Sequence, residues 1–450
     1  MKTLAATFLI FVGFSSFAQQ HFAGATTSQR IGLIQSGMNP AELANLSSKY
    51  EVQLFSVSAN ANNNKIGFGD LFGSESFESL IFRGTEAVDL RFDGELYGPG
   101  FAIKVDKWAF ALTSKAYAKL DLVDVDVKIG DAVSTATLNA LINGSTTINN
   151  NFNQRLNGTT WGEIGLSAAN NFYDDGTHKL SAGATFKLLF PASYANFGAD
   201  RFNGTITNNL GDVNLTNASA NLNIAYSGNL GDEFTKFGDY TSSLFGRLGG
   251  VAADFGVNYR FVDQNDPTKY RLNAGLALRN LGSMKFKDSN NSQTNYVLSI
   301  QGIEALNLNQ FQNVESLEEI EDILLASGYL DRTVSTKREF KVKLPTVFSA
   351  YADVQIVPKF FASVYIQQKL NGDEANDQIT YQNVFSIAPR FALQHFEVWS
   401  NWSSNEISGI SGGIGFRAYG FYLGSGSIIT NLIADNKQAD AFIGYSFGLD

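Results

Sequence analysis

The sequence has 450 residues, of which 44% are hydrophobic and only 17% charged, with a formal net charge of −10 and no cysteine. In a typical soluble domain about a quarter of the residues are charged. The lower fraction here favours a protein with one face in contact with lipid. The acidic balance argues against a nucleic-acid partner, and the absence of cysteine excludes disulfides, thiolate metal sites and a cysteine nucleophile.

The first eighteen residues have the pattern of a secretory signal peptide. Lys2 supplies a short basic region, residues 4–14 are apolar, and Ser16 and Ala18 are small residues placed as at a cleavage site. We therefore expect cleavage after Ala18 and export of the chain. The rival interpretation, a membrane anchor, needs a longer apolar run than this one.

Residues 19–49 are not strand-like, and a short helix is expected within them. Asn39 is a good N-cap, and Pro40 stands at the first helical position, where a missing N–H costs nothing. Glu42 follows the cap by three residues, so it is expected to reach back to the backbone as a capping-box acid.

From Tyr50 onward, apolar and polar side chains alternate with a period of two, which predicts β-strands. The clearest case is 346–369, where Phe348, Val354 and Ile366 share one face and Asp353 and Lys369 the other. Each strand has about 10 residues, the length that a tilted strand needs to cross a bilayer. The expected strands are 50–60, 87–105, 108–120, 161–172, 179–190, 248–262, 270–283, 346–356, 360–369, 381–393, 396–402, 410–418, 421–430 and 440–447.

Short and long connections alternate between these strands. About six tight turns alternate with longer segments such as 122–160, 191–246 and 284–339. A soluble β-sandwich has no reason to segregate its loop lengths in this way, whereas an outer-membrane barrel has short periplasmic turns and long extracellular loops. The pattern predicts an all-β protein, a transmembrane antiparallel β-barrel of about 14 strands over 50–450.

One long connection contains an expected helix. Ser316 and Glu319 form a capping box, and Leu317, Ile320 and Leu324 make an apolar stripe. The helix either packs on its own loop, or forms a lid over the barrel mouth or a docking face for a partner protein.

No arrangement of residues for catalysis is found in the sequence. It has no nucleophile elbow, zinc-protease motif or phosphate-binding loop, and its three histidines are far apart, so we expect no enzyme activity, metal or cofactor. A group of aspartates suits either a solvated acidic rim or a divalent cation, and residues 263–266 are assigned to turn chemistry. The group comprises Asp121, Asp124, Asp126 and Asp131.

Charged residues at inward positions of the strands are the remaining candidates. Since a Lys or Arg that faces lipid costs about 2–4 kcal/mol at mid-depth, these side chains are expected to pair within the lumen. A selective charged path is the alternative. The residues are Asp254, Arg260, Arg271, Arg279, Asp353, Lys369, Arg390 and Arg417.

The triplet Asn39–Pro40–Ala41, placed before the first strand, resembles the N-terminal signature of the outer-membrane fatty-acid transporter family. It also resembles related barrels common in Bacteroidota, including the shuttle barrel of type IX secretion. The resemblance implies a barrel of a Gram-negative outer membrane, with segment 19–49 plugging the lumen and residues Asn39, Pro40, Ala41 and Glu42 at the ligand or plug site.

The same resemblance implies two functions. In the first, small hydrophobic molecules pass inward as the segment is displaced, so that gating is conformational. In the second, the barrel transports nothing and scaffolds or docks other outer-membrane or periplasmic proteins. Outer-membrane lipid is an expected partner in both.

Overall fold

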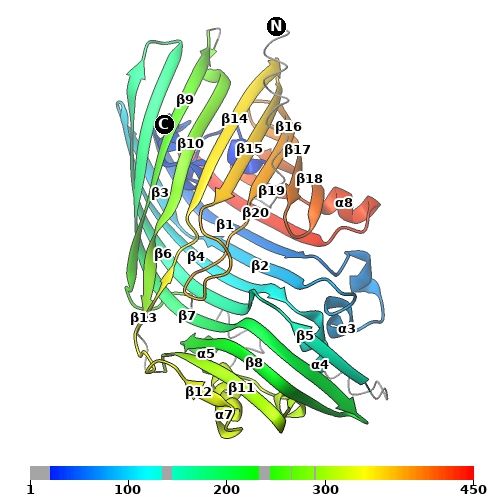
Figure 1. Cartoon of the computed structure of the whole chain (residues 1–450). Helices are drawn as coiled ribbons and strands as arrows, with labels where there is room; N and C mark the ends of the chain where they lie inside the picture. The colour runs from blue at the N-terminus through cyan, green and yellow to red at the C-terminus, as the bar shows by residue number, and fades with distance from the viewer. Residues whose placement is uncertain (1–20, 134–143, 233–243, 265, 288–289) are drawn as a thin grey trace, which may run out of the picture.

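The structure, a computed structural model, describes residues 21–133, 144–232, 244–264, 266–287 and 290–450. The expected signal peptide lies outside these residues. One antiparallel sheet closes into a ring of 14 strands, as Figure 1 shows. The ring contains, in order, β1 (Tyr50–Asn63), β2 (Val88–Tyr97) with β3 (Gly100–Val105), β4 (Trp108–Val125), β6 (Asn153–Asp174), β7 (His178–Asn209), β9 (Gly250–Asp263), β10 (Asp266–Phe286), β14 (Val347–Val357), β15 (Phe360–Lys369), β16 (Val384–Ala392), β17 (Phe396–Asn405), β18 (Gly409–Ala418), β19 (Phe421–Ser425) and β20 (Gln438–Leu449).

The ring closes where the first and last strands pair. Tyr50 of β1 is in register with Leu449 of β20, and the pairing continues to Asn62 and Gln438. β2 and β3 together form one ring strand, which is interrupted at 98–99. The predicted fold class, an antiparallel barrel of about 14 strands, is therefore confirmed.

The tight turns gather at one end of the ring, the end that holds the start of β1 and the close of β20. Several of them contain a residue with positive φ, as tight hairpin turns require. These residues are Asp106 (φ 54°), Gly176 (φ 84°), Lys359 (φ 71°) and Tyr419 (φ 54°). In an outer-membrane barrel this end faces the periplasm, so the long connections face outward.

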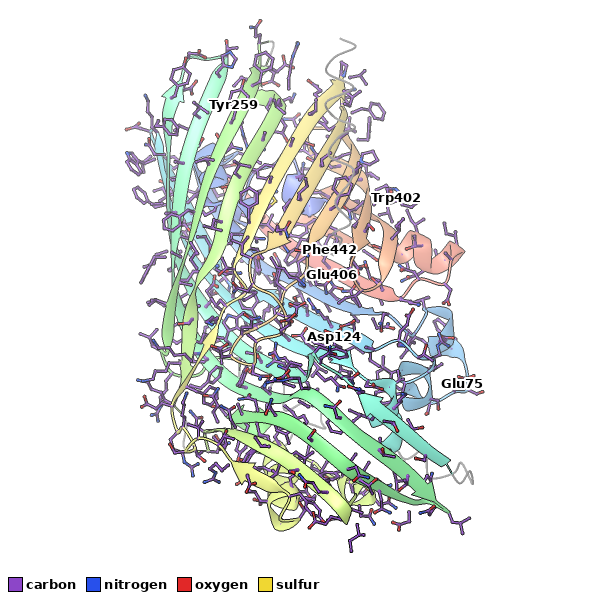
Figure 2. All side chains as sticks on the ribbon, in the orientation of Figure 1. Glu75, Asp124, Tyr259, Trp402, Glu406 and Phe442 are labelled. Atoms are coloured by element: carbon purple, nitrogen blue, oxygen red, sulfur yellow. The ribbon has the colours of Figure 1, made fainter. Side chains whose placement is uncertain are left out.

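The two faces of the ring differ in polarity, as the alternation predicts. Phe348 and Ile366 point outward with 39% and 44% of their surface exposed, whereas Asp353 on the same hairpin is 1% exposed. Figure 2 shows side chains projecting from the outer face, among them Trp402, which is 41% exposed. Such an apolar outside with a polar inside suits a wall surrounded by hydrocarbon. Among the described residues, no helix has the length and apolarity needed to cross a membrane.

The outward residue Phe255 offers a test of the membrane-facing surface. Phe255 is 52% exposed, near the middle of β9. We expect Phe255→Arg to lower the free energy of unfolding in lipid vesicles by about 2–4 kcal/mol, because the guanidinium would face hydrocarbon. Urea titration of the vesicle-embedded barrel measures this change. Phe255→Leu is the control, and equal stability of the two variants would contradict the assignment of this face to lipid.

The same sheet extends beyond the ring at the long-loop end, at the bottom of Figure 1, and we term this part the external sheet. It forms because β7 continues through Pro191. The sequence predicts a strand that ends at residue 190, followed by a long connection. The first half of β7 pairs with β9, and the second half pairs with β8 (Asp212–Ser227). Pro191 is accommodated at a β-bulge opposite Trp161, a site where a strand tolerates the missing N–H. The external sheet has the order β5 (Gly144–Asn149), β7, β8, β11 (Ser292–Asn307) and β12 (Leu330–Arg332).

The external sheet has its own apolar core. Ile224, Tyr226, Tyr296 and Leu298 are buried in it, beneath α7 (Leu317–Ala326). The other elements outside the ring wall are β13 (Phe340–Lys343), η4 (Gly69–Phe72), α3 (Phe77–Ile81), α4 (Val127–Val133), α5 (Asn229–Asp232), η6 (Leu308–Phe311) and α8 (Ile428–Ile433).

Residues 21–49, the plug segment, lie within the ring. They contain η2 (Ala25–Thr27), α2 (Leu33–Met38) and η3 (Pro40–Asn45), and almost every residue from 22 to 46 is buried or nearly so. Contacts run to strands on every side of the ring: Phe22 meets the rings of Tyr97 and Phe442, and Asn45 bonds to Ser181 and Asn258. The segment therefore occupies the lumen.

Candidate functional site

The site is the contact between the plug segment and the inner wall of the ring. Its turn begins at Asn39, whose side-chain oxygen accepts a hydrogen bond from the Ala41 N–H at 3.0 Å. Pro40 follows at the first position of η3, as predicted, although the helix is of the 3-10 type. The Asn39 amide also donates to the Val257 carbonyl at 3.0 Å and to the Tyr351 hydroxyl at 3.1 Å. Asn39 therefore caps the turn and attaches it to the wall.

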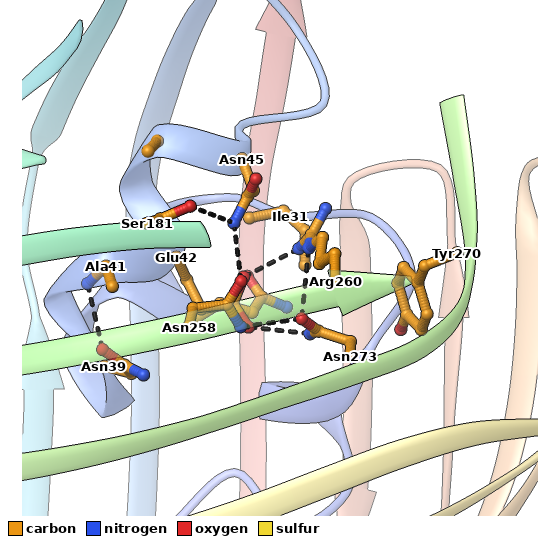
Figure 3. A network of polar contacts seen from close by, with 12 residues as sticks. Ile31, Asn39, Ala41, Glu42, Asn45, Ser181, Asn258, Arg260, Tyr270 and Asn273 are labelled. Carbon is orange, nitrogen blue, oxygen red and sulfur yellow. Dashed lines mark hydrogen bonds and ion pairs between the residues drawn. The ribbon is translucent and has the colours of Figure 1, made fainter. Parts of the chain in front are cut away.

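Glu42 is the main polar anchor of the segment, as Figure 3 shows. Its carboxylate accepts hydrogen bonds from Arg260 at 2.7 Å, Asn273 at 2.7 Å and Tyr351 at 2.6 Å, and only 1% of the residue is exposed. The expected capping box is wrong, because the carboxylate turns to these donors and the Asn39 N–H donates to the Gln35 carbonyl. A buried carboxylate with this many donors fixes one position of the segment.

Three wall glycines, Gly183, Gly256 and Gly275, form what we term the glycine seat. Gly183 of β7 and Gly256 of β9 are cross-strand partners, and Pro40 lies against both of them. A Cβ on Gly183 would stand 2.5 Å from the Pro40 carbonyl carbon and 2.6 Å from the Ala41 nitrogen. At Gly183 the segment thus meets the wall backbone to backbone, an approach that only glycine permits, whereas Gly256 and Gly275 make room for the Asn39 side chain.

Most of the charged residues predicted to face the lumen have buried side chains in ion pairs or hydrogen bonds. Asp353 and Arg390 are joined at 2.5 Å, and Glu397 bonds to Arg417 at 2.7 Å. Arg390 also donates to the Thr27 carbonyl, which ties this cluster to the plug segment. The others are Asp254 with Lys187 at 2.8 Å, Arg260 with Glu42 at 2.7 Å, Arg279 with Gln367 at 2.6 Å, and Lys369 with Asp373 at 2.6 Å and Glu406 at 2.8 Å.

Arg271 departs from the expected position. Its side chain is 51% exposed and lies 3.7 Å from Asp263, at the tight-turn end of the ring. The register of β10 shifts between Tyr270 and Leu272, so both Tyr270 and Asn273 face inward and the parity is broken between them. Such a bulge re-aims one side chain, which strict alternation cannot anticipate.

The inner wall also holds polar residues that were not among the predicted site residues. Asn258, Asn273 and Tyr351 form the network around Glu42, and Arg155 donates to Asn196 and to backbone carbonyls at 373 and 378. Strand parity was the signal that could have found them. Asn258 shares its face of β9 with Asp254 and Arg260, but only the charged side chains were selected as site residues.

Three small cavities, of about 10, 20 and 30 Å³, remain between the segment and the wall. The first borders Leu33 and Gly37 of the segment and reaches the wall at Gly98 and Gly100, where the ring strand is interrupted. At the tight-turn end, a vestibule of about 1160 Å³ opens below the segment, bordered by Arg30 among others. Among the described residues, the plug segment therefore leaves little space against the wall at these three places.

An apolar pocket of about 350 Å³ lies on the outer flank of the ring, at the long-loop end. Its floor consists of outward-facing wall residues, Ala61 of β1 and Phe92 of β2. The connection between these strands folds over the floor and contributes Phe68, Leu71 and Phe77. The pocket therefore presents hydrocarbon and aromatic surface, in contrast to the polar lumen.

The predicted apolar helix stripe packs on the external sheet. Leu317 and Leu324 are buried there, and Ile320 packs against the same core. Glu321 on α7 accepts a hydrogen bond from Tyr226 at 3.1 Å, and burial together with this carboxylate raises the pKa of Tyr226 above its ordinary value. These side chains fix the helix to its own sheet and leave its stripe covered.

The candidate aspartates do not converge on one point. Asp121 lies 3.8 Å from Arg91, and Asp126 accepts hydrogen bonds from Asn150 and from the backbone of Lys128. Asp124 is half-buried, and its N–H donates to Asp89. The side chain of Asp131 lies outside the described part of the chain. The carboxylates of Asp121 and Asp126 thus have local partners.

Comparison with known proteins gives one family and several structures. Residues 40–426 match a protein family described as "Family of unknown function (DUF5723)". No curated protein matches the sequence. The Ralstonia pickettii toluene transporter TbuX is similar in structure, with 12% sequence identity and a TM-score of 0.43 over 94% of this chain and 95% of that one. The Pseudomonas putida toluene transporter TodX has 9% identity and a TM-score of 0.45, over 96% of this chain and 98% of that one. A Pseudomonas aeruginosa FadL homologue has 10% identity and a TM-score of 0.39, over 96% of this chain and 98% of that one.

Proposed function

The chain belongs to the family of unknown function DUF5723, and we propose that it is an outer-membrane barrel which passes small hydrophobic molecules when its plug segment moves. The observation that carries this proposal is the apolar pocket of about 350 Å³ on the outer flank. Pockets for small ligands begin at about 300 Å³ and are lined mainly by hydrophobic and aromatic side chains. The pocket is thus suited to capture an apolar molecule.

The wall and its occupant support gated passage. The lumen is filled by a segment that is held through ion pairs, hydrogen bonds and packing, in a chain without cysteine. Such contacts can exchange for others, so a second position of the segment is accessible, and a ligand that prefers it shifts the population. The vestibule on the opposite side gives the displaced segment and the ligand an aqueous exit.

The pocket and the segment are connected through one ring strand. Leu90 and Phe92 of β2 line the pocket, and the same ring strand is interrupted at Gly98, beside the small cavity that borders Leu33 and Gly37. Phe92 and Gly98 are separated by about 20 Å along the strand. We place the route of the ligand from the pocket along this strand to the segment. The covered stripe of α7 offers no comparable support for the scaffold hypothesis.

Filling the pocket should abolish uptake. We expect Ala61→Trp to reduce the uptake of radiolabelled oleate or naphthalene at least tenfold, in cells of a host without a barrel of this kind, because the indole would occupy the pocket. Ala59→Trp is the matched control, since Ala59 also points outward from β1 but does not line the pocket. Equal uptake by both variants and the parent protein, at equal surface expression, would refute the proposed route.

A further inference from the structure

A histidine and two carboxylates come together where the plug segment touches β2. The Nε2 atom of His21 lies 3.3 Å from Asp93 Oδ2 and 3.7 Å from Glu95 Oε1. The three possible ligand atoms all lie within 4.8 Å of one another. His21 belongs to the segment, whereas Asp93 and Glu95 belong to the wall, so the group joins two parts of the molecule that are distant in sequence.

Among the described residues, Nε2 of His21 has no hydrogen bond of ordinary geometry, although Asp93 and Glu95 lie within ion-pair distance. The His21 side chain is only 7% exposed. The opposite nitrogen, Nδ1, contacts the Ser58 hydroxyl at 2.9 Å. This is the arrangement of a metal-binding imidazole, in which an outer hydrogen bond fixes the ring and leaves the other nitrogen to the ion.

There is also space beside these atoms. A cavity of about 30 Å³ is bordered by both His21 and Glu95, by Tyr97 and Tyr381, and by the cation Arg279. About 10–15 Å³ already accommodates a water molecule, so the cavity has room for a small ligand beside the imidazole. The ligand spacing fits as well, since bonds of about 2.0–2.1 Å in a tetrahedral shell set neighbouring ligand atoms about 3.4 Å apart.

The charges that face the group leave a place for a cation. Lys119 forms an ion pair with Asp93, and Lys115 lies over the Tyr97 ring at 4.2 Å. The Oδ2 atom of Asp93 serves both Lys119 and His21, while Oδ1 is buried without a partner. One oxygen can therefore bind a metal while the other keeps Lys119.

We propose that His21, Asp93 and Glu95 bind a zinc ion that clamps the plug segment to β2. Imidazole nitrogen and carboxylate oxygen are both ligand types that Zn²⁺ binds, and a water in the fourth position would complete a tetrahedral shell. Calcium and magnesium prefer shells made of oxygen only, so the imidazole selects against them. The proposal does not depend on transport, because a scaffold barrel with the same segment would carry the same site.

Zinc binding by the full-length barrel in detergent tests this site, with a purification tag that contains no histidine. Titration with Zn²⁺ against a chelating dye should give one ion per chain for the parent protein and a raised melting temperature. His21→Ala and Glu95→Gln should each abolish both effects. Ser58→Ala should weaken binding about 10–100-fold, because it removes only the outer hydrogen bond.

The other two histidines provide matched controls. His178 and His395 lie near tight turns, stacked on Tyr259 and Tyr419, and their replacement by alanine should leave zinc binding unchanged. Cobalt in place of zinc should give a visible absorption spectrum that His21→Ala removes. Absence of stoichiometric zinc on the parent protein, or equal binding by a folded His21→Ala variant, would overturn the assignment.

Discussion

Gly183→Ala should unseat the plug segment and turn a closed barrel into a conducting one. The added methyl group would stand 2.5 Å from the Pro40 carbonyl and 2.6 Å from the Ala41 nitrogen. Both are backbone atoms, so no side-chain rotation relieves the contact and the turn must move away from the wall. Overpacking of this kind costs about 1–3 kcal/mol. Here it raises the free energy only of the conformation in which the plug segment lies against the glycine seat.

Single-channel recording in a planar bilayer measures this effect as the fraction of time spent open. Gly94→Ala is the matched control, because Gly94 is also a strand glycine and its added Cβ would find its nearest neighbour at 3.6 Å. We expect rare openings for the parent protein and Gly94→Ala, and frequent openings for Gly183→Ala. Closed behaviour of all three would show that the segment does not depend on the glycine seat.

Glu42→Ala should expose the plug segment to solvent. Removal of this carboxylate leaves Arg260 buried without its partner at 2.7 Å, and breaking a buried ion pair in this way costs about 3–5 kcal/mol. Because every 1.4 kcal/mol is a factor of ten, the unseated population should rise by about 100-fold to 4,000-fold. The double variant Glu42→Ala with Arg260→Leu should recover much of the seating, since it no longer buries an unpaired charge.

The absence of cysteine allows a direct measurement of this population. Ala44→Cys places a single thiol at a position with 0% exposure within the plug segment. Its rate of reaction with a soluble maleimide should rise with Glu42→Ala and stay unchanged with Glu75→Ala, a change at an exposed glutamate outside the ring. Equal rates for both would mean that Glu42 is not the anchor.

The barrel itself could be predicted from the sequence because its signal is local. A period of two along each strand and a rule for loop lengths suffice, and Phe348, Asp353 and Ile366 take the positions that the alternation predicts. Arg271 was misplaced because a bulge shifts the register by one residue. The fifth strand was expected to end at Phe190, but a bulge accommodates Pro191 and the strand continues beyond it.

The site was harder to predict, because it depends on contacts between distant parts of the chain. Asn39 and Pro40 carry a local turn signal, and that turn forms. The role of Glu42 could not be predicted, since its partners Arg260, Asn273 and Tyr351 come from three other strands. The His21 group was missed for the same reason: the histidines were compared with one another, and not with wall carboxylates.

The unbroken course of β7 has a mechanical consequence. The strand contains Gly183 of the seat and continues through the bulge at Pro191 into the external sheet, with β6 hydrogen-bonded beside it over most of its length. We therefore expect a force on the external sheet to twist or tilt the part of the wall that contacts Pro40. The external sheet and the wall that contacts Pro40 are therefore parts of one continuous strand.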